Sequence, residues 1–411
     1  MRYLYDLNLW LYQLLLALVA LWHPRAKRFI QSRKGIFESL RIELEKNTQP
    51  TIWLHLASLG EYEQALPIIT SLKSERPEHL LLITFYSPSG YEVVKRSNTQ
   101  DLVHYLPFDS HQNASKFLDL VKPELAIFIK YELWYHYLIQ IRKRQIPAIL
   151  ISAVFRKNQF YFEPYGYFFK KAFQAFDHFF VQNEESLALL SKYGFENVTL
   201  AGDTRFDRVM EIANSKKPKL ELSTLKTEKF TIVLGSIWSS DLGILNDVIL
   251  SLREQVRFII ATHHIDENAL AHFDHLSGTR FSTATPTERI NAEILILDTM
   301  GMLSSVYSIA DITIVGGGSR GALHNILEPA AHGKPVLFQQ HSNNSKFLEV
   351  KGILDAKGGF DFASQEELQV LIDRLISDLD FRETIGKNSR KFVSENAGAT
   401  QKIMSKIAEI V

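Results

Sequence analysis

The stretch Val315-Gly316-Gly317-Gly318-Ser319, followed by His324-Asn325-Ile326-Leu327-Glu328-Pro329 and then Pro335-Val336-Leu337-Phe338, decides the fold of this chain. Its order predicts a strand, a glycine turn, a helix and a second strand. Glycine lets the backbone approach a ligand closely, and a helix start offers unpaired N–H groups to an anion. Glu328 lies one turn further on, where its carboxylate can accept hydrogen bonds from ribose hydroxyls. The stretch therefore predicts a nucleotide pocket.

Short apolar runs alternate with helical patterns on the N-terminal side of this stretch and through it. This alternation is typical of a parallel sheet covered by helices on both faces. The strands expected in the first half are 51–57, 79–85, 102–106, 124–129, 146–152, 178–181 and 198–201, with helices beginning near Glu61, Ser89, Ser110, Leu133 and Glu184. The strands expected in the second half are 230–234, 256–261, 293–297, 312–315 and 335–338, with helices after Ser239, Asp266, Met302 and His324 and near Ser364. We therefore predict two doubly wound α/β domains.

The polar, charged stretch 214–229 contains one proline and no long apolar period, so we predict it to be the linker. The predicted division is an N-terminal helix with its basic flank (1–34), a first Rossmann-like domain (35–213) and a second one (230–411). A chain of 411 residues with 46% hydrophobic content can form two cores. The C-terminal residues look helical and could cross back to the first domain. Ligands of open α/β sheets bind at the carboxyl ends of the strands.

Composition excludes several classes of function. The 46 Lys and Arg residues balance the 46 Asp and Glu residues, so we expect no nucleic-acid partner. The absence of cysteine excludes disulfides and thiolate chemistry. The sequence lacks a zinc spacing such as His-Glu-x-x-His, and adjacent histidines point in different directions along a chain, so we also expect no metal site.

The first residues differ from the rest of the chain. The run Leu7–Trp22 is almost wholly apolar, with a tryptophan near each end, and it is followed by Arg25, Lys27 and Arg28. A spanning helix needs roughly 20 apolar residues, so this run is slightly short. It could insert obliquely or lie in the interface with its basic residues on anionic head groups, or it could be an ordinary buried helix. We predict a membrane anchor, and the positive-inside rule then places the remaining chain in the cytoplasm.

Charged side chains follow three of the strands expected in the first half. Glu61 could accept a proton from a hydroxyl, or it could simply complement the dipole of the helix that begins there. Glu132 follows the fourth strand and suits the rim of a site, but a pair with Lys130 is the alternative. Arg205 follows the seventh strand, where it could stabilise a leaving phosphate or pair with a neighbouring aspartate.

The second half offers two further candidates at strand ends. Ser236 lies in a turn that follows a strand and opens a helix, so backbone N–H groups and hydroxyls there could hold a phosphate. The alternative is an ordinary N-cap by Ser239 or Ser240. Thr262 and His263 follow the next strand, where a histidine could contact a phosphate or base or serve as a polar rim residue.

Taken together, these motifs resemble the 3-deoxy-D-manno-octulosonic acid (Kdo) transferases, membrane-bound GT-B glycosyltransferases that add Kdo from CMP-Kdo to a lipid A precursor. The resemblance covers nearly the whole chain and includes the apolar N-terminus with its basic flank. The other motifs that carry it are Ala57-Ser58-Leu59-Gly60-Glu61, Glu132-Leu133-Trp134, Gly202-Asp203-Thr204-Arg205-Phe206-Asp207, Asp298-Thr299-Met300-Gly301, Gly317-Gly318-Ser319 and His324-Asn325-Ile326-Leu327-Glu328-Pro329-Ala330-Ala331-His332.

The resemblance implies a role for each matching position. Glu61 falls on the general base, which deprotonates the acceptor hydroxyl as it attacks the anomeric carbon of Kdo and CMP departs. Glu132 and Arg205 fall on residues that assist the transition state. The positions that fall on donor-contacting segments are Ser236, Thr262, His263, Gly301, Met302, Leu303, Ser319, Asn325, Ile326, Leu327 and Glu328.

The resemblance also implies the partners and the place of the reaction. The donor is the substrate CMP-Kdo, the acceptor is a lipid A precursor of the lipid IVA type, and no cofactor is needed. Transfer is expected at the membrane surface, on the cytoplasmic side of the inner membrane. The sequence departs from the family at four places. Arg205 replaces a Lys among the residues that assist the transition state. Thr262-His263 replaces Pro-Arg, Met302 replaces a Glu and Ile237-Trp238 replaces Thr-His, and these three affect the donor site more than the base.

Other classes share parts of this pattern. A nucleotide-sugar epimerase could have the same glycine turn and the same ribose-binding Glu328, although it has no need of an anchor. A GT-B transferase with a different donor and a non-catalytic sugar-nucleotide binder are the remaining alternatives. Replacement of Glu61 by Gln separates a transferase from a binder, because only a transferase has an activity to lose.

Overall fold

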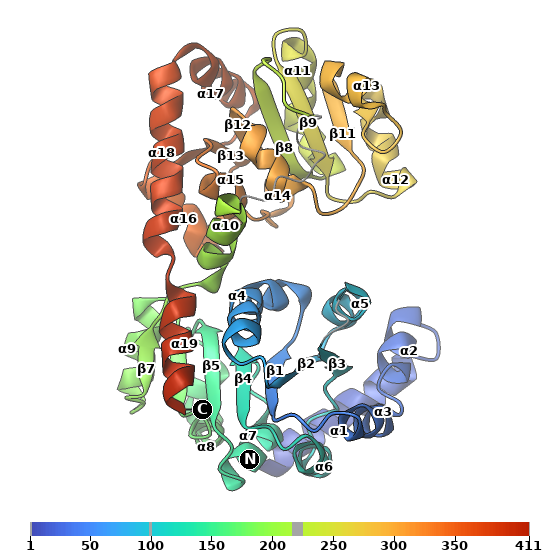
Figure 1. The fold of residues 1–411 in the computed structure, drawn as a ribbon, viewed down its shortest axis with the longest axis vertical. Helices are drawn as coiled ribbons and strands as arrows, with labels where there is room; N and C mark the ends of the chain where they lie inside the picture. The colour runs from blue at the N-terminus through green and yellow to red at the C-terminus, as the bar shows by residue number, and fades with distance from the viewer. Residues whose placement is uncertain (1, 98–100, 216–224, 411) are drawn as a thin grey trace. The chain divides into compact units, whose positions relative to one another are not determined.

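The computed structural model describes residues 2–97, 101–215 and 225–410, and these form two compact units (Figure 1). Unit 1 contains Met1–Arg208 together with Gly398–Val411, and unit 2 contains Val209–Ala397. The division thus falls at Arg208, earlier than the linker expected from the sequence. Residues 216–224 of that expected linker lie outside the described residues. The final helix belongs to unit 1, so the chain returns to the unit in which it began.

Within its described residues, unit 1 contains a sheet of seven parallel strands in the order β3-β2-β1-β4-β5-β6-β7. The strands are β1 (Thr51–Leu56), β2 (Leu80–Phe85), β3 (Leu102–Tyr105), β4 (Leu125–Ile129), β5 (Ala148–Ala153), β6 (His178–Val181) and β7 (Val198–Leu200). The order reverses between β1 and β4, which lie side by side. A reversal of this kind separates the loops that follow the two strands and makes room for a ligand at their carboxyl ends.

Helices cover both faces of this sheet. The helices of unit 1 are α1 (Arg2–Val19), α2 (Pro24–Gln31), α3 (Ile36–Glu45), α4 (Leu59–Glu75), α5 (Pro88–Ser97), α6 (His111–Val121), α7 (Tyr135–Lys143), α8 (Lys170–Phe173), α9 (Glu184–Lys192) and α19 (Ala399–Ile410), while α10 (Thr204–Asn214) contains the division between the units. Because side chains alternate along a strand, Trp53 of β1 packs on the face covered by α6 and α7, whereas Leu54 packs on the face covered by α4 and α19. The same alternation places His55 on the Trp53 face.

The described part of unit 2 repeats this architecture with seven parallel strands in the order β10-β11-β9-β8-β12-β13-β14. The strands are β8 (Thr231–Ile237), β9 (Arg257–Thr262), β10 (Thr279–Arg280), β11 (Ile294–Leu297), β12 (Ile312–Val315), β13 (Val336–Gln339) and β14 (Gly359–Phe362). The reversal now lies between β8 and β12. The sequence analysis missed β10 and β14, which are the two edge strands, because each is very short and only partly apolar.

The helices of unit 2 include the predicted ones and two that were not predicted, at residues 286–291 and 348–355. They are α11 (Leu242–Leu252), α12 (Glu267–Leu270), α13 (Pro286–Asn291), α14 (Leu303–Val306), α15 (Leu327–Ala331), α16 (Leu348–Asp355), α17 (Gln365–Ser377) and α18 (Leu379–Asn396). Several begin with a polar side chain that accepts a hydrogen bond from the first turn, as Ser364 does from the Glu367 N–H. The two doubly wound α/β domains expected from the sequence are therefore confirmed.

Helix α1 lies at the predicted position, but no helix among the described residues is long and apolar enough to cross a membrane. Its 18 residues include the charged Arg2 and Asp6, and it ends at Val19, before the second tryptophan. The fold prediction is thus wrong in its apolar membrane-anchor helix, which is not found among the described residues. None of the described residues of α1 is buried, and its large exposed apolar side chains are Tyr3, Leu4, Leu7, Trp10, Leu11, Tyr12, Leu14, Leu15, Leu18 and Val19.

Polar contacts of Tyr5 and Asp6 attach the N-terminal half of α1 to the rest of unit 1. The Tyr5 hydroxyl donates to the Asp109 carboxylate at 2.6 Å, and the Asp6 carboxylate lies 2.5 Å from His136 Nε2. Asp109 is buried and also accepts from the backbone N–H groups of His136 and Tyr137. The N-terminal half of α1 is therefore held against the loop before α6 and the start of α7.

Candidate functional site

Glu61 lies in the first turn of α4, directly after the carboxyl end of β1. Its carboxylate accepts a hydrogen bond from the Ala57 N–H, and the residue is only 8% exposed. Burial raises the pKa of Glu61 to about 7, and the charge of Glu132 acts in the same direction, while the Ala57 N–H and the charge of Lys130 oppose them. A carboxyl that ionises near neutral pH is suited to general base catalysis.

Glu132 follows β4, the strand that pairs with β1. Its Oε2 accepts from Trp134 Nε1 at 2.8 Å and lies 3.0 Å from His55 Nε2. The other ring nitrogen of His55, Nδ1, lies 2.9 Å from the Thr84 hydroxyl and 3.1 Å from the Thr84 carbonyl oxygen. Two carboxyl groups and a fully buried imidazole therefore gather where the strand order reverses.

His55 was not among the predicted site residues. The available signal was a histidine inside an otherwise apolar strand, because a polar residue that is buried in a strand needs a partner. The partner, Glu132, comes from the loop after β4, which is distant in the sequence. Sequence reasoning could therefore notice the polar residue but could not name Glu132 as its partner.

Glu61 and Glu132, here called the acid pair, are connected to α1 through aromatic contacts of Trp134. The Trp134 ring packs on the Tyr86 ring, with 4.7 Å between centroids, and the Tyr86 hydroxyl donates to the Tyr12 hydroxyl of α1 at 3.4 Å. Arg33, after α2, donates to the carbonyl oxygens of Phe29 and Tyr86. The helix with the exposed apolar side chains therefore lies close to Glu132.

Arg205 begins α10 and pairs with Asp203, the alternative that the sequence left open. Its Nε donates to Asp203 Oδ2 at 2.9 Å, and its Nη2 lies 2.8 Å from the same oxygen. Asp207 instead accepts from the Gly398 and Thr400 N–H groups at the start of α19. The Arg205 side chain remains 29% exposed, so its guanidinium is oriented by Asp203 and still reaches the surface.

In unit 2, Asp241 organises the loops that follow β8 and β12. Its Oδ2 accepts from the Trp238 N–H at 2.9 Å and from the Gly317 N–H at 3.0 Å, and its Oδ1 accepts from the Ser319 hydroxyl. The glycine turn is thus closed partly by an internal carboxylate, a contact that the sequence analysis did not foresee. Ser236 lies in a bulge of β8 with a φ of 57° and is half-buried.

Four aromatic and imidazole rings gather beside this turn. The Trp238 ring stacks on the His263 ring with 3.9 Å between centroids, and Trp238 Nε1 donates to His324 Nε2 at 2.9 Å. His264 meets the edge of this stack, and the guanidinium of Arg320 lies 4.6 Å from the Trp238 ring centre. Burial lowers the pKa of His263 to about 4, and the charges of His324, His264 and Arg320 lower it further. His263 is therefore neutral at pH 7.

The remaining predicted donor contacts differ in accessibility. Ser319, Asn325 and Glu328 are half-buried, and Asn325 Nδ2 donates to Glu328 Oε1 at 3.2 Å. The exposed Gly301 has a φ of +81°, which favours glycine, and the half-buried Leu303 begins α14. Three positions are in the core: Met302, Ile326 and Leu327. Thr262 is also buried, and its hydroxyl donates to the His264 carbonyl oxygen at 2.8 Å.

These core positions act by packing. Met302 is 5% exposed, its sulfur accepts from the Thr299 hydroxyl, and it belongs to a hydrophobic cluster with Tyr307. Ile326 and Leu327 are fully buried at the start of α15. In this structure they position the loops that bear the accessible residues and present no side-chain surface of their own.

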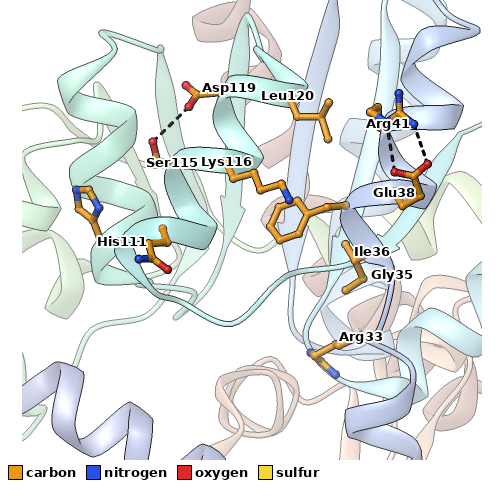
Figure 2. A pocket seen from close by; sticks show the side chains of 12 residues that line it. Arg33, Gly35, Ile36, Glu38, Arg41, His111, Ser115, Lys116, Asp119 and Leu120 are labelled. Carbon is orange, nitrogen blue, oxygen red and sulfur yellow. Dashed lines mark hydrogen bonds and ion pairs between the residues drawn. The ribbon is translucent and has the colours of Figure 1, made fainter.

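A pocket of about 970 Å³ lies in unit 1 between α3 and α6, away from the acid pair. Figure 2 shows Lys116 extending from α6 toward α3, and its ammonium group lies 4.5 Å from the centre of the Phe37 ring. Arg33 also lines this pocket. Across residues 2–97, 101–215 and 225–410, no cluster of three or more His, Asp or Glu side chains could hold a metal ion.

The sequence matches one protein family and several of its curated members. Residues 28–208, which include Glu61, Glu132 and Arg205, match the family model described as 3-deoxy-D-manno-octulosonic-acid transferase (kdotransferase). The transferase of Aquifex aeolicus is 28% identical over 340 residues, covering 81% of this chain and 88% of its own length. The transferase of Rickettsia bellii is 28% identical over 377 residues, covering 88% of this chain and 87% of its own length. The transferase of Haemophilus influenzae is 24% identical over 411 residues, covering 95% of this chain and 93% of its own length.

Solved structures show the same two-domain fold at low sequence identity. A putative UDP-N-acetylglucosamine 2-epimerase from Listeria monocytogenes gives a TM-score of 0.61 at 11% identity, over 88% of this chain and 96% of its own. A glycosyltransferase from Rickettsia africae gives 0.58 at 15% identity, over 88% and 99%. The GT-B-like fold is shared by epimerases and transferases, so the sequence relatives distinguish between them. The chain is therefore similar to the 3-deoxy-D-manno-octulosonic acid transferases over most of its length, and residues 28–208 match the model of that family.

Proposed function

We propose that the protein transfers Kdo from CMP-Kdo to a lipid A precursor of the lipid IVA type, with Glu61 as the general base. The observation that supports this most strongly is the buried Glu61 carboxyl at the carboxyl end of β1, with its pKa raised to about 7. At neutral pH such a group is ionised in part of the molecules and can accept a proton. It also lies where the strand order of unit 1 reverses, the usual place for a ligand in this architecture.

The proposed reaction is a direct displacement. The acceptor hydroxyl gives its proton to the Glu61 carboxylate while its oxygen forms a bond to the anomeric carbon of Kdo. The bond between that carbon and the phosphate oxygen breaks, and CMP leaves as an anion. Arg205, oriented by Asp203, supplies positive charge for this leaving group, and Glu132 assists beside Glu61.

Unit 2 supplies the donor site in this proposal. Glu328, in the first turn of α15, accepts hydrogen bonds from the ribose in this proposal. Ser236, Ser319 and Asn325 lie at least half-buried at the same edge of the sheet and can meet the phosphate or the base. The reaction needs no cofactor, because the leaving group is already an anion that positive charge and helix dipoles can stabilise.

A lipid acceptor accounts for the surface of α1. Its exposed leucine, tryptophan and tyrosine side chains suit the interfacial region of a membrane, and the exposed Arg25 and Lys27 that follow suit anionic head groups. The contacts from Tyr12 through Tyr86 and Trp134 connect this surface to Glu132. We therefore place the enzyme on the cytoplasmic side of the inner membrane, with α1 lying in the interface.

The test is to incubate the purified protein with CMP-Kdo and lipid IVA and to measure the mass of the lipid product. The proposal expects a mass increase equal to one or more Kdo units, and it expects this product to disappear when Glu61 is changed to Gln. Parallel reactions with UDP- and GDP-sugars test other donors. Product formed only with those donors, or a sugar nucleotide converted without any lipid, would exclude the proposed reaction.

A further inference from the structure

His55 is fully buried on β1 and its two ring nitrogens face different kinds of partner. Nδ1 lies 3.1 Å from the Thr84 carbonyl oxygen, which can only accept a hydrogen bond. The Thr84 hydroxyl, 2.9 Å away, already accepts from Trp53 Nε1 and lies 3.3 Å from the Leu54 carbonyl oxygen, to which it donates. These partners require a hydrogen on Nδ1.

The contacts of Nε2 then favour two arrangements over a third, in which the Trp134 N–H alone bridges two unprotonated atoms only 3.0 Å apart. Nε2 lies 3.0 Å from Glu132 Oε2, so one proton lies between them, either on the ring or on the carboxyl group. The indole N–H of Trp134 suits both cases, because it lies 2.8 Å from Oε2 and 2.9 Å from Nε2. With the proton in either position, the His55–Glu132 pair has no net charge.

This neutrality matters because Glu61 is the next carboxyl group at the same strand ends. Two neighbouring carboxyl groups without a further partner compete for one proton and ionise together only at higher pH. We propose that His55 is a positioning residue that supplies the proton for Glu132, so that Glu61 does not share a proton with Glu132. The inference rests on the proposed role of Glu61 as the base.

The surrounding charges are consistent with this role. Glu61 is influenced by Glu132, Lys130 and Tyr131, and Lys130 is the cation among them. Burial raises the pKa values of Tyr86 and Tyr161, and the charge of Glu132 raises them further, so these phenols are neutral. The imidazole of His55 is in direct contact with Glu132 and can carry an extra proton.

Two substitutions separate a proton carrier from a simple hydrogen-bond donor. His55→Gln keeps an amide N–H that can reach Glu132 but cannot take up a proton. His55→Leu removes both functions. The matched control is His104→Gln, because His104 on β3 also lies 3.0 Å from a glutamate, Glu43, but contacts no group of the acid pair.

The readouts are the pH dependence of the transferase rate and the NMR titration of the Glu61 carboxyl carbon in ¹³C-glutamate-labelled protein. We expect both His55 variants to move the Glu61 titration and the acidic limb of the rate profile upward by about one pH unit. The rate at high pH should stay within about threefold of wild type with KM unchanged, because the base is intact once it is ionised. His104→Gln should change neither readout.

The proposal is overturned if His55→Gln titrates as the wild type does, because His55 would then serve only as a donor. It is also overturned if neither variant shifts the titration. His55→Gln gives the decision even if the leucine variant fails to fold. Since the NMR titration needs no substrate, a shifted Glu61 in a protein without transferase activity would refute the proposed function and leave the inference about His55 standing.

Discussion

The two units have the same strand order but opposite chemistry at the carboxyl ends of their central strands. In unit 1, the loops after β1 and β4 bring together the carboxyl groups of Glu61 and Glu132. In unit 2, the loops after β8 and β12 bring together a glycine turn and the stacked rings of Trp238 and His263. The fold fixes where a site can form, and the side chains decide whether it handles protons or binds an anionic nucleotide.

Each sheet also contains a serine with left-handed backbone at a bulge. Ser152 of β5 has a φ of 54° and Ser236 of β8 a φ of 57°, and the strand register shifts at both places. Ser152 is buried, and its hydroxyl lies 3.2 Å from the Thr204 hydroxyl, whereas Ser236 is half-exposed. The same backbone strain therefore serves packing in unit 1 and leaves a hydroxyl accessible in unit 2.

The largest expected effect is the loss of catalysis when Glu61 becomes Gln. The amide cannot accept the proton, so the transfer rate should fall by roughly 10²–10⁴-fold, the usual contribution of a general base. Binding of CMP, measured by calorimetry, should remain within about twofold because the proposed donor site lies in unit 2. The control is Glu63→Gln on the exposed side of the same helix, which should keep full activity. An active Glu61→Gln enzyme would show that Glu61 is not the catalytic base.

The next effect concerns stability and belongs to unit 2. A Cβ atom added at Gly235 of β8 would lie 1.8 Å from the hydroxyl oxygen of Tyr307, which is buried and cannot move aside. Gly235→Ala should therefore destabilise unit 2 by about 1–3 kcal/mol in urea unfolding. Gly243→Ala, in α11, is the control: nothing lies within 4 Å of its added Cβ, and the helix should gain about 0.5–1 kcal/mol. Equal behaviour of the two variants would contradict the close packing at β8.

The comparison also shows which features a sequence reveals. Apolar runs such as Leu125–Ile129 are continuous and fully buried, so their pattern alone identifies central strands. The edge strands β10 and β14 are short and half-buried, and they leave a weaker pattern. Strand-end position correctly brought Glu61 and Glu132 to one edge. The partners of these residues, such as His55 for Glu132, come from distant segments and needed the structure.

Unit 2 gives the same lesson at its glycine turn. The glycines predicted that a group would lie close to the backbone of this turn. The sequence could not show that this group is the Asp241 carboxylate, which accepts a hydrogen bond from the Gly317 N–H. Likewise, the motif match placed Met302 and Ile326 among the donor contacts, although both side chains are in the core. A motif marks a segment, whereas burial decides which of its atoms can touch a ligand.

A third prediction compares wild type and Glu61→Gln by stability against pH. The pKa of Glu61 in the folded protein is about 7, above the ordinary value of 4.5, so the favourable contribution of the protonated group is present below pH 4.5 and lost as the pH rises through 7. The amide does not titrate. The variant should therefore gain about 1–2 kcal/mol of unfolding free energy relative to wild type between pH 4.5 and 7.5, measured by urea titration.

The control for this measurement is Glu38→Gln on α3. A hydrogen bond from Arg41 lowers the pKa of Glu38, so its contribution is lost only on acidification below the ordinary range. No comparable rise between pH 4.5 and 7.5 is expected for this variant. If the difference in unfolding free energy between Glu61→Gln and wild type were also independent of pH, burial would not raise the pKa of Glu61. The contrast between the carboxyl groups of unit 1 and the rings of unit 2 would then be weaker.

The smallest expected effect tests the neutral rings of unit 2. Trp238→Phe keeps a ring against His263 but removes the N–H that donates to His324 Nε2 at 2.9 Å. That donor stabilises the neutral imidazole, so the pKa of His324, which burial lowers, should rise in the variant. Histidine NMR titration measures this change, with His332 as the internal control because its Nε2 contacts the distant Ser304 carbonyl oxygen.

CMP affinity should change by less than about threefold at pH 8 and more at pH 6, where His324 of the variant gains charge. An unchanged pKa of His324 would show that burial alone keeps this ring neutral. The Trp238 indole would then pack against the neighbouring rings without affecting their charge.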